Sequence, residues 1–254
     1  MEWVKDFYSR QYKWLKSSAI WAQYPPDDPP SQARRRAAAV ERLAGSDIKH
    51  ILELGCGSGL IAGAMALLGH KVVAVDLVDE AVANARRVAA KVPNGEMIVF
   101  QEDFYEIKFD DKFDVVCYFD GFGIGSDSDQ RRLLHRIAEW LKPHGCALID
   151  VYSPWVFAND SGEVYQQGNM MGRCDFDPDE CRLLDKMWPV GSDETKAINQ
   201  SLRCYSPADF QLLLQGTNLK MHTLEPYESA FEFDNRVPLQ EAEIYLAKLV
   251  LSNA

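Results

Sequence analysis

The chain lacks the marks of a secreted or membrane-spanning protein. Its longest uncharged apolar run, Leu60–Leu68, is far shorter than the ~20 residues that a membrane-spanning helix needs. Its beginning, Met1–Asp6, is partly charged, and no apolar signal segment follows. The six cysteines include no C-x-x-C pair, and three of them fall in the glycine-rich motif or in expected core strands. We therefore expect a cytoplasmic protein with reduced thiols and no membrane contact.

The chain is also poor in positive charge. Its 27 Lys and Arg stand against 38 Asp and Glu, which gives a net charge of -11 and disfavours a nucleic-acid substrate. The basic run Arg34–Arg36 lies in an expected helix, where it indicates a solvated helix face. With 47% hydrophobic residues, the chain can still bury a sizeable core.

Metal-ligand patterns are missing as well. The segment Cys174–Cys181 combines two cysteines and several acids, but no second pair of close ligands accompanies it, as a zinc site would require. The acids also lack the central glycine of a calcium loop. The five histidines are scattered, and none pairs convincingly with a carboxylate. We expect no metal.

What the chain does have is a glycine-rich turn after a buried strand. The apolar segment Ile51–Leu54 runs into Gly55, Gly57 and Gly59, and a helical pattern begins at Leu60. Glycine has no Cβ and tolerates positive φ, so backbone can come very close to a ligand there. The following helix directs unpaired N–H groups and a positive dipole end into the same space. This pattern favours a nucleotide-sized site.

A carboxylate follows at the spacing that ribose recognition requires. Lys71–Leu77 is typical of a second buried strand, and Asp76 stands at its tip, placed to accept hydrogen bonds from ribose hydroxyls. A dinucleotide fingerprint, G-x-G-x-x-G, would need glycine where Leu60 stands. That difference counts against a nicotinamide-dependent oxidoreductase.

From here the chain resembles the class I S-adenosylmethionine-dependent methyltransferases. Glu53–Gly59 matches the family's first motif, an acidic residue followed by glycine-x-glycine-x-glycine, and Asp76 matches its ribose-binding acid. Gln101–Phe104 is similar to the element that contacts adenine, and Phe113–Asp120 to the fourth strand. Leu141–Gly145 is similar to the turn before the fifth strand, with His144 as its one departure. The resemblance covers about residues 48 to 152.

The resemblance implies S-adenosyl-L-methionine as the cofactor. The cofactor-binding residues that it implies or that adjoin its motifs are Glu53, Gly55, Cys56, Gly57, Gly59, Asp76, Leu77, Asp103, Phe104, Asp120 and Tyr8. Asp120 is also the candidate catalytic residue, since the family often places a substrate-side group there. A general base, a contact to the donor's amino acid part and a simple turn all remain open for it. Cys56 is interpreted as a small residue that fits the loop, because no partner base accompanies it.

Aromatic residues supply the candidate acceptor pocket. Tyr152 and Trp155 leave the fifth strand near the same mouth, and Tyr12 lies on an expected N-terminal helix; these three are the predicted substrate-binding residues. The N-terminal aromatics also include Trp21 and Tyr24. In similar methyltransferases such a helix closes over the cofactor, while simple packing of an amphipathic helix is the alternative.

Alternation of strands and helices predicts an α/β fold: a Rossmann-like, doubly wound, seven-stranded sheet. It carries an N-terminal helical extension and, after the fifth strand, an inserted small β-rich lid. The expected strands are 49–54, 71–76, 97–101, 114–119, 146–152, 219–224 and 243–251, and the expected helices are 2–19, 31–43, 59–68, 79–91, 128–141 and one from 206.

Three regions follow from this pattern. They are a helical cap at 1–45, a core at 46–152 and 206–254, and a lid at 153–205. An edge-covering or dimerising flap is the alternative for the lid, because long insertions are often but not always functional.

The function that the sequence favours is methyl transfer by in-line displacement to an oxygen or nitrogen of a small-molecule metabolite. A carbon acceptor stays open, as does a homodimer. The alternatives are a protein that binds S-adenosylmethionine without methyl transfer, as a regulator or cyclising enzyme, and the nicotinamide-dependent oxidoreductase.

Overall fold

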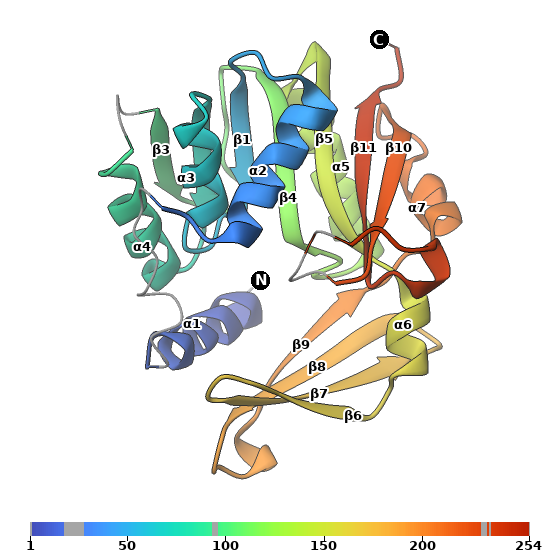
Figure 1. Cartoon of the computed structure of the whole chain (residues 1–254). Coiled ribbons are helices and arrows are strands. Elements are labelled where there is room, and N and C mark those ends of the chain that lie inside the picture. The colour runs from blue at the N-terminus through green and yellow to red at the C-terminus, as the bar shows by residue number, and fades with distance from the viewer. Residues whose placement is uncertain (1, 18–27, 93–95, 230–232, 234, 254) are drawn as a thin grey trace.

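The computed structural model describes residues 2–17, 28–92, 96–229, 233 and 235–253. Its main element is a seven-stranded sheet with the order β10-β11-β5-β4-β1-β2-β3 (Figure 1). The strands are β1 (His50–Leu54), β2 (Lys71–Asp76), β3 (Met97–Gln101), β4 (Phe113–Phe122), β5 (Leu141–Tyr152), β10 (Leu219–Tyr227) and β11 (Ile244–Leu251). The first five are parallel, and β11 pairs antiparallel with both β5 and β10. The predicted doubly wound, seven-stranded sheet is confirmed.

Helices cover both faces of this sheet. One face carries α2 (Ser31–Ala44), α3 (Leu60–Leu67) and α4 (Asp79–Ala89); the other carries α5 (Asp127–Trp140) and α7 (Pro207–Leu214). Both α5 and α7 begin with a capping box, formed by Ser126 with Asp129 and by Ser206 with Asp209. Such boxes satisfy helix N–H groups that have no intrahelical partner.

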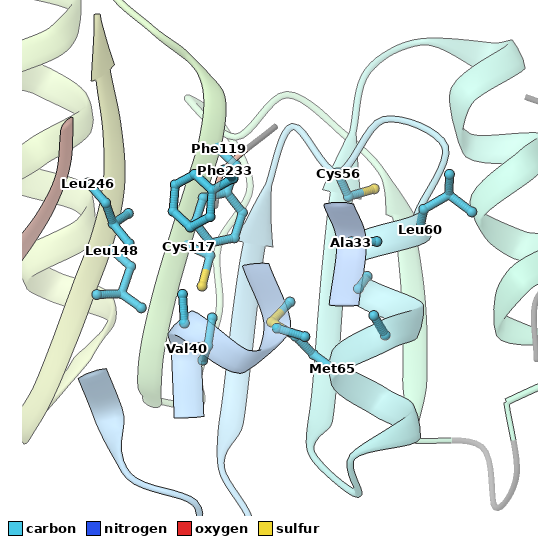
Figure 2. Close-up of a cluster of buried hydrophobic side chains, with 14 of the residues drawn as sticks. Ala33, Val40, Cys56, Leu60, Met65, Cys117, Phe119, Leu148, Phe233 and Leu246 are labelled. Atoms are coloured by element: carbon cyan, nitrogen blue, oxygen red, sulfur yellow. The ribbon is translucent and has the colours of Figure 1, made fainter. Parts of the chain in front are cut away.

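Two apolar layers sandwich the sheet because successive strand residues point to opposite faces. In β1, Ile51 belongs to the layer under α2 and α3, while Leu52 belongs to the layer under α5 and α7. Figure 2 shows the first of these layers, where Val40 of α2, Met65 of α3 and Cys117 of β4 come together. Burial on both faces explains why these strands are almost purely apolar.

The insertion forms a second sheet, as predicted. Its four antiparallel strands, in the order β6-β7-β8-β9, are β6 (Glu163–Gln167), β7 (Met170–Asp177), β8 (Arg182–Pro189) and β9 (Ile198–Arg203). Short helices flank it: α6 (Pro154–Asn159), η2 (Glu194–Lys196) and, before β11, η3 (Leu239–Glu241). This sheet, residues 163–203, is called the lid below. It lies beyond the carboxyl ends of the parallel strands (Figure 1).

Helix α1 (Glu2–Ser17) packs between the lid and α4 (Figure 1). Its Phe7 is buried against Met170, Met187 and Ile198 of the lid. Two of the N-terminal aromatics named above, Trp21 and Tyr24, lie outside the described residues. No helix in the described part of the chain is both long enough and apolar enough to span a bilayer.

Two expectations need correction. Arg36 is not on a solvated helix face: it is buried, pairs with Asp150 and lies over the rings of Phe119 and Phe233. The reason is its position on α2, in the same buried stripe as Ala33, Ala37 and Val40. The fifth strand also begins earlier than residue 146, because Leu141 already pairs with Phe113.

Candidate active site

The glycine loop between β1 and α3 has the backbone that the motif predicts. Gly55, Gly57 and Gly59 all have positive φ, at 59°, 55° and 77°, which side chains other than glycine rarely adopt. Gly59 is the N-cap of α3, and a Cβ on it would lie 2.7 Å from the Cβ of Ala85. Glycine at this position therefore lets α3 and α4 pack closely while the loop turns.

Asp76, at the end of β2, is tied directly to this loop. Its carboxylate accepts a hydrogen bond from the backbone N–H of Gly57 at 2.8 Å and another from Val78 at 2.9 Å. Burial raises the pKa of Asp76, and the two backbone donors oppose that rise. Each carboxylate oxygen can accept a further hydrogen bond. Asp76 can thus hold the loop and still bind hydroxyl groups of a ligand.

Helix α1 brings two tyrosines onto the same loop. A Cβ on Gly57 would lie 2.5 Å from the Tyr12 hydroxyl, so that hydroxyl rests against the glycine. The Tyr8 hydroxyl donates a hydrogen bond to Gln200 Oε1 of the lid at 3.2 Å. Burial raises the pKa of Tyr8, and the charges of Asp120, Asp76 and Asp185 raise it further. Tyr8 therefore lies among carboxylates from β2, β4 and the lid.

The other predicted cofactor contacts follow the neighbouring strands. Leu77 is half-buried directly after β2. Asp103 follows β3 and accepts a hydrogen bond from the N–H of Tyr105 at 2.8 Å, while the Phe104 ring packs against Tyr118. Cys56 is buried inside the loop, and burial raises the pKa of its thiol well above the usual value. A thiol kept protonated is a poor nucleophile, as the sequence indicated.

Asp120, two residues before the end of β4, has a strained conformation. Its φ of 54° is left-handed, which is uncommon for a residue other than glycine and tends to occur at functional sites. Its backbone N–H donates to Asp150 of β5 at 3.2 Å, and the Tyr152 hydroxyl donates to its carboxylate. The Asp120 side chain is accessible to solvent, yet the surrounding protein removes enough water to raise its pKa.

Three charged residues of the core are buried: Arg36, Asp150 and Glu53. Asp150 is fully buried, and burial raises its pKa to about 6, against the opposing effect of the Arg36 guanidinium. Glu53, also buried, has its pKa raised to about 8 by desolvation, and its Oε2 has no partner among the described residues. Sequence reasoning named Glu53 but missed Arg36 and Asp150.

The lid is bound to the turn that follows β4, close to Asp120. The N–H of Arg203, at the end of β9, donates to the carbonyl of Gly123 at 2.9 Å, and Leu202 forms a bridge with Ile124. A Cβ on Gly123 would lie 2.4 Å from the Arg203 carbonyl oxygen, so only glycine allows this approach. The position of the lid and the position of Asp120 are thus set together.

A further carboxylate, which sequence reasoning missed, belongs to the lid. Asp185 of β8 is buried and accepts hydrogen bonds from the Tyr165 hydroxyl and from Gln200 Nε2, both at 3.0 Å. Burial raises the pKa of Asp185 to about 6. Trp155, by contrast, lies on α6 and is about one-third exposed (37%). No described hydrogen bond or ring contact joins it to the residues above.

Comparisons with known proteins agree with this geometry. Residues 51–145 match the model of a family described as "Methyltransferase domain". Cypemycin N-terminal methyltransferase from a Streptomyces species is 31% identical over 129 residues, which make up 50% of this chain and 51% of that protein. The chain spans about half the length of the curated relatives it matches.

Solved structures share the fold over nearly the whole chain. The CcbJ methyltransferase from Streptomyces caelestis superposes with a TM-score of 0.75 at 20% identity, covering 92% of this chain and 95% of that one. The glycopeptide N-methyltransferase MtfA, in complex with S-adenosylmethionine, gives a TM-score of 0.60 at 18% identity, covering 87% of this chain and 94% of that one. At these identities the likeness shows the fold alone.

Proposed function

Because this chain contains a class I S-adenosylmethionine-dependent methyltransferase domain, whose cofactor is S-adenosyl-L-methionine, we propose that it methylates a small-molecule acceptor at nitrogen or oxygen. The domain lies in the core sheet, and the lid is proposed to cover the acceptor. The activities named for two similar proteins, cypemycin N-terminal methyltransferase and the glycopeptide N-methyltransferase MtfA, support acceptors of this kind. The net charge of -11 argues against nucleic acid.

The observation that carries the proposal is the junction of the glycine loop with Asp76. The Asp76 carboxylate holds the Gly57 N–H, and both lie beyond the carboxyl ends of adjacent parallel strands. Open α/β sheets bind ligands at this position, with the acid on ribose hydroxyls. The unpartnered Oε2 of Glu53, buried beneath the loop, adds a polar atom that a bound ligand or water can satisfy. The residues present therefore fit the cofactor.

The chain's own groups suit methyl transfer. When bound, S-adenosyl-L-methionine supplies a methyl group on a positively charged sulfur. The enzyme's main contribution is to hold the acceptor in line with that methyl group, which is worth about 7–11 kcal/mol when the geometry is right. The lid and α1 pack against each other beside the site, and Asp120 can accept a proton or stabilise positive charge on the acceptor.

Calorimetric titration with S-adenosylmethionine, S-adenosylhomocysteine and NADH tests this function. We expect micromolar binding of both sulfur ligands and none of NADH. Asp76→Ala should weaken S-adenosylhomocysteine binding at least tenfold, about 1.4 kcal/mol, because the ribose hydroxyls and the loop both lose a hydrogen-bond acceptor. Absence of binding by both sulfur ligands in folded protein would refute the proposal, and an unchanged dissociation constant would remove Asp76 from the site.

A further inference from the structure

The lid presents one face to the donor site. Residues of its strands alternate between two faces, and the face that packs on α1 includes Met187 of β8 and Ile198 of β9. Asp185, two residues before Met187, points the same way, as does Gln200, its partner across the strands. An acidic side chain thus occupies an inward position between apolar ones.

Side-chain hydrogen bonds fix the position of the Asp185 carboxylate. Tyr165, on β6, reaches across β7 to donate to Asp185, and it can do so because Gly172 lies beneath its ring: a Cβ there would be 2.0 Å from the ring. Gln200 donates its amide N–H to Asp185 and accepts from Tyr8 of α1. Two of the roughly four acceptor positions of the carboxylate remain open.

The surroundings leave the charge of Asp185 uncompensated. Among the described residues no Lys, Arg or His forms an ion pair with Asp185, while the nearby Asp175 is paired with Lys186, and Asp150 with Arg36. A buried anion that no cation pairs with is costly unless a cationic ligand arrives.

These observations point to the class of acceptor. We propose that Asp185 is the specificity-determining residue of the lid and that the acceptor is a small molecule whose amine it binds in its protonated form. This inference rests on the proposed methyl transfer and adds to it the nitrogen acceptor. Tyr165 and Gln200 are positioning residues, which fix the carboxylate.

An amine also matches the charge changes of the reaction. The bound ammonium first loses a proton to a carboxylate or to water. The nitrogen lone pair then forms the C–N bond as the C–S bond breaks, and that electron pair stays on sulfur. Positive charge moves from sulfur to nitrogen during this step, so carboxylates beside the nitrogen stabilise the transition state. The methylated ammonium leaves as a cation.

Paired probes test the inference: glucosamine with glucose, tyramine with tyrosol, and cyclohexylamine with cyclohexanol. Each is titrated at pH 8 into protein saturated with S-adenosylhomocysteine, so that binding is measured without turnover. We expect at least one amine to bind at least tenfold more tightly than its alcohol. Asp185→Asn should reduce that preference to within about threefold, and Tyr165→Phe should weaken it partly.

Asp175→Asn is a control variant in the same lid. The Asp175 carboxylate pairs with Lys186 on the other face of the lid. It should keep the amine preference, and both Asn variants should bind S-adenosylhomocysteine as the unmodified protein does. If no amine binds better than its alcohol, or if Asp185→Asn keeps the preference, the inference is wrong. If S-adenosylhomocysteine itself does not bind, the proposed function fails, which is a separate result.

Discussion

The two halves of the candidate site are built in different ways. The donor half, made of the glycine loop, Asp76 and Asp103, uses backbone groups at the ends of parallel strands. The acceptor half, made of Asp120, Tyr152, Tyr165 and Asp185, uses side chains from four different strands, β4, β5, β6 and β8. The donor half is organised along the chain, whereas the acceptor half exists only after the lid has docked on the core.

This difference separates what is shared with relatives from what is particular to this chain. A backbone cradle recognises a fixed ligand, so one loop geometry serves many enzymes. Side chains on a lid can change without disturbing the sheet, so they can set the acceptor. The family match of residues 51–145 ends before the lid begins, as this division predicts.

The largest effect should come from the acceptor half. Asp120→Asn removes the negative charge at the strained end of β4 while keeping its shape and its backbone hydrogen bond. We expect the turnover number to fall about a hundredfold or more, with the dissociation constant of S-adenosylhomocysteine changed less than threefold. Steady-state kinetics and calorimetry measure the two quantities. Equal losses in both would instead assign Asp120 to the donor half.

The donor half should be most sensitive to a change that displaces its backbone. Gly59→Ala places a Cβ 2.8 Å from the Cα of Ala85 at a φ of 77°, so the loop or α4 must shift. We expect S-adenosylhomocysteine binding to weaken about thirtyfold and the free energy of unfolding to fall by about 2 kcal/mol. Gly69→Ala is the control, since its φ is also positive but nothing lies within 4 Å of an added Cβ. Equal effects of the two variants would mean that strain alone, without the contact, decides.

The same division explains what the sequence could predict. The strands, the helices and the donor residues follow from local signals: apolar runs, glycines and acids at strand ends, as at Asp76. Asp185 has no such signal, because the alternation of polar and apolar residues in Arg182–Pro189 does not define one inward face. Leu184 and Trp188 could equally have formed it. Only pairing within the lid settles which residues point inward.

Arg36 shows a second limit. Three consecutive arginines resemble a solvated surface, but helical periodicity carries only one of them into the apolar stripe. That position needed a buried acid to pair with, and Asp150 comes from a strand more than 100 residues later. Spacing could have flagged Arg36 as inward, but its partner could not be identified before the tertiary structure was known.

The free energy of unfolding should show that the ionised Asp185 destabilises the folded protein, which indicates that this residue serves function. Its pKa is about 6 in the folded protein against an ordinary 3.8, so the folded state binds more protons between these values. Its ionisation therefore costs stability, and the cost appears as the pH rises through 6. We expect Asp185→Asn to be more stable than the unmodified protein at pH 8, by roughly 1–3 kcal/mol, and about equally stable near pH 4.

Urea unfolding at several pH values measures this difference. The groups that act on Asp185 besides its hydrogen-bond partners Tyr165 and Gln200 are Asp120, Cys174 and Tyr8. All of them are present in both proteins, so their own titration largely cancels in the comparison. A stability difference that does not change between pH 4 and pH 8 would contradict the raised pKa of Asp185.

The smallest effect should come from the link between the halves. Tyr8 links both, because it lies near Asp76 of the donor half and donates to Gln200 of the lid. Tyr8→Phe removes one hydrogen bond between neutral groups, worth about 0.5–1.5 kcal/mol, so S-adenosylhomocysteine should bind a few-fold more weakly.

The coupling between the two ligands gives a sharper measurement. If α1 joins the halves, a bound amine probe increases the affinity for S-adenosylhomocysteine by some factor, and bound S-adenosylhomocysteine increases the affinity for the amine by the same factor. In Tyr8→Phe that factor should approach one. A factor that stays unchanged would mean that the halves communicate through other contacts between lid and core, such as those of Arg203 and Arg182 with Gly123.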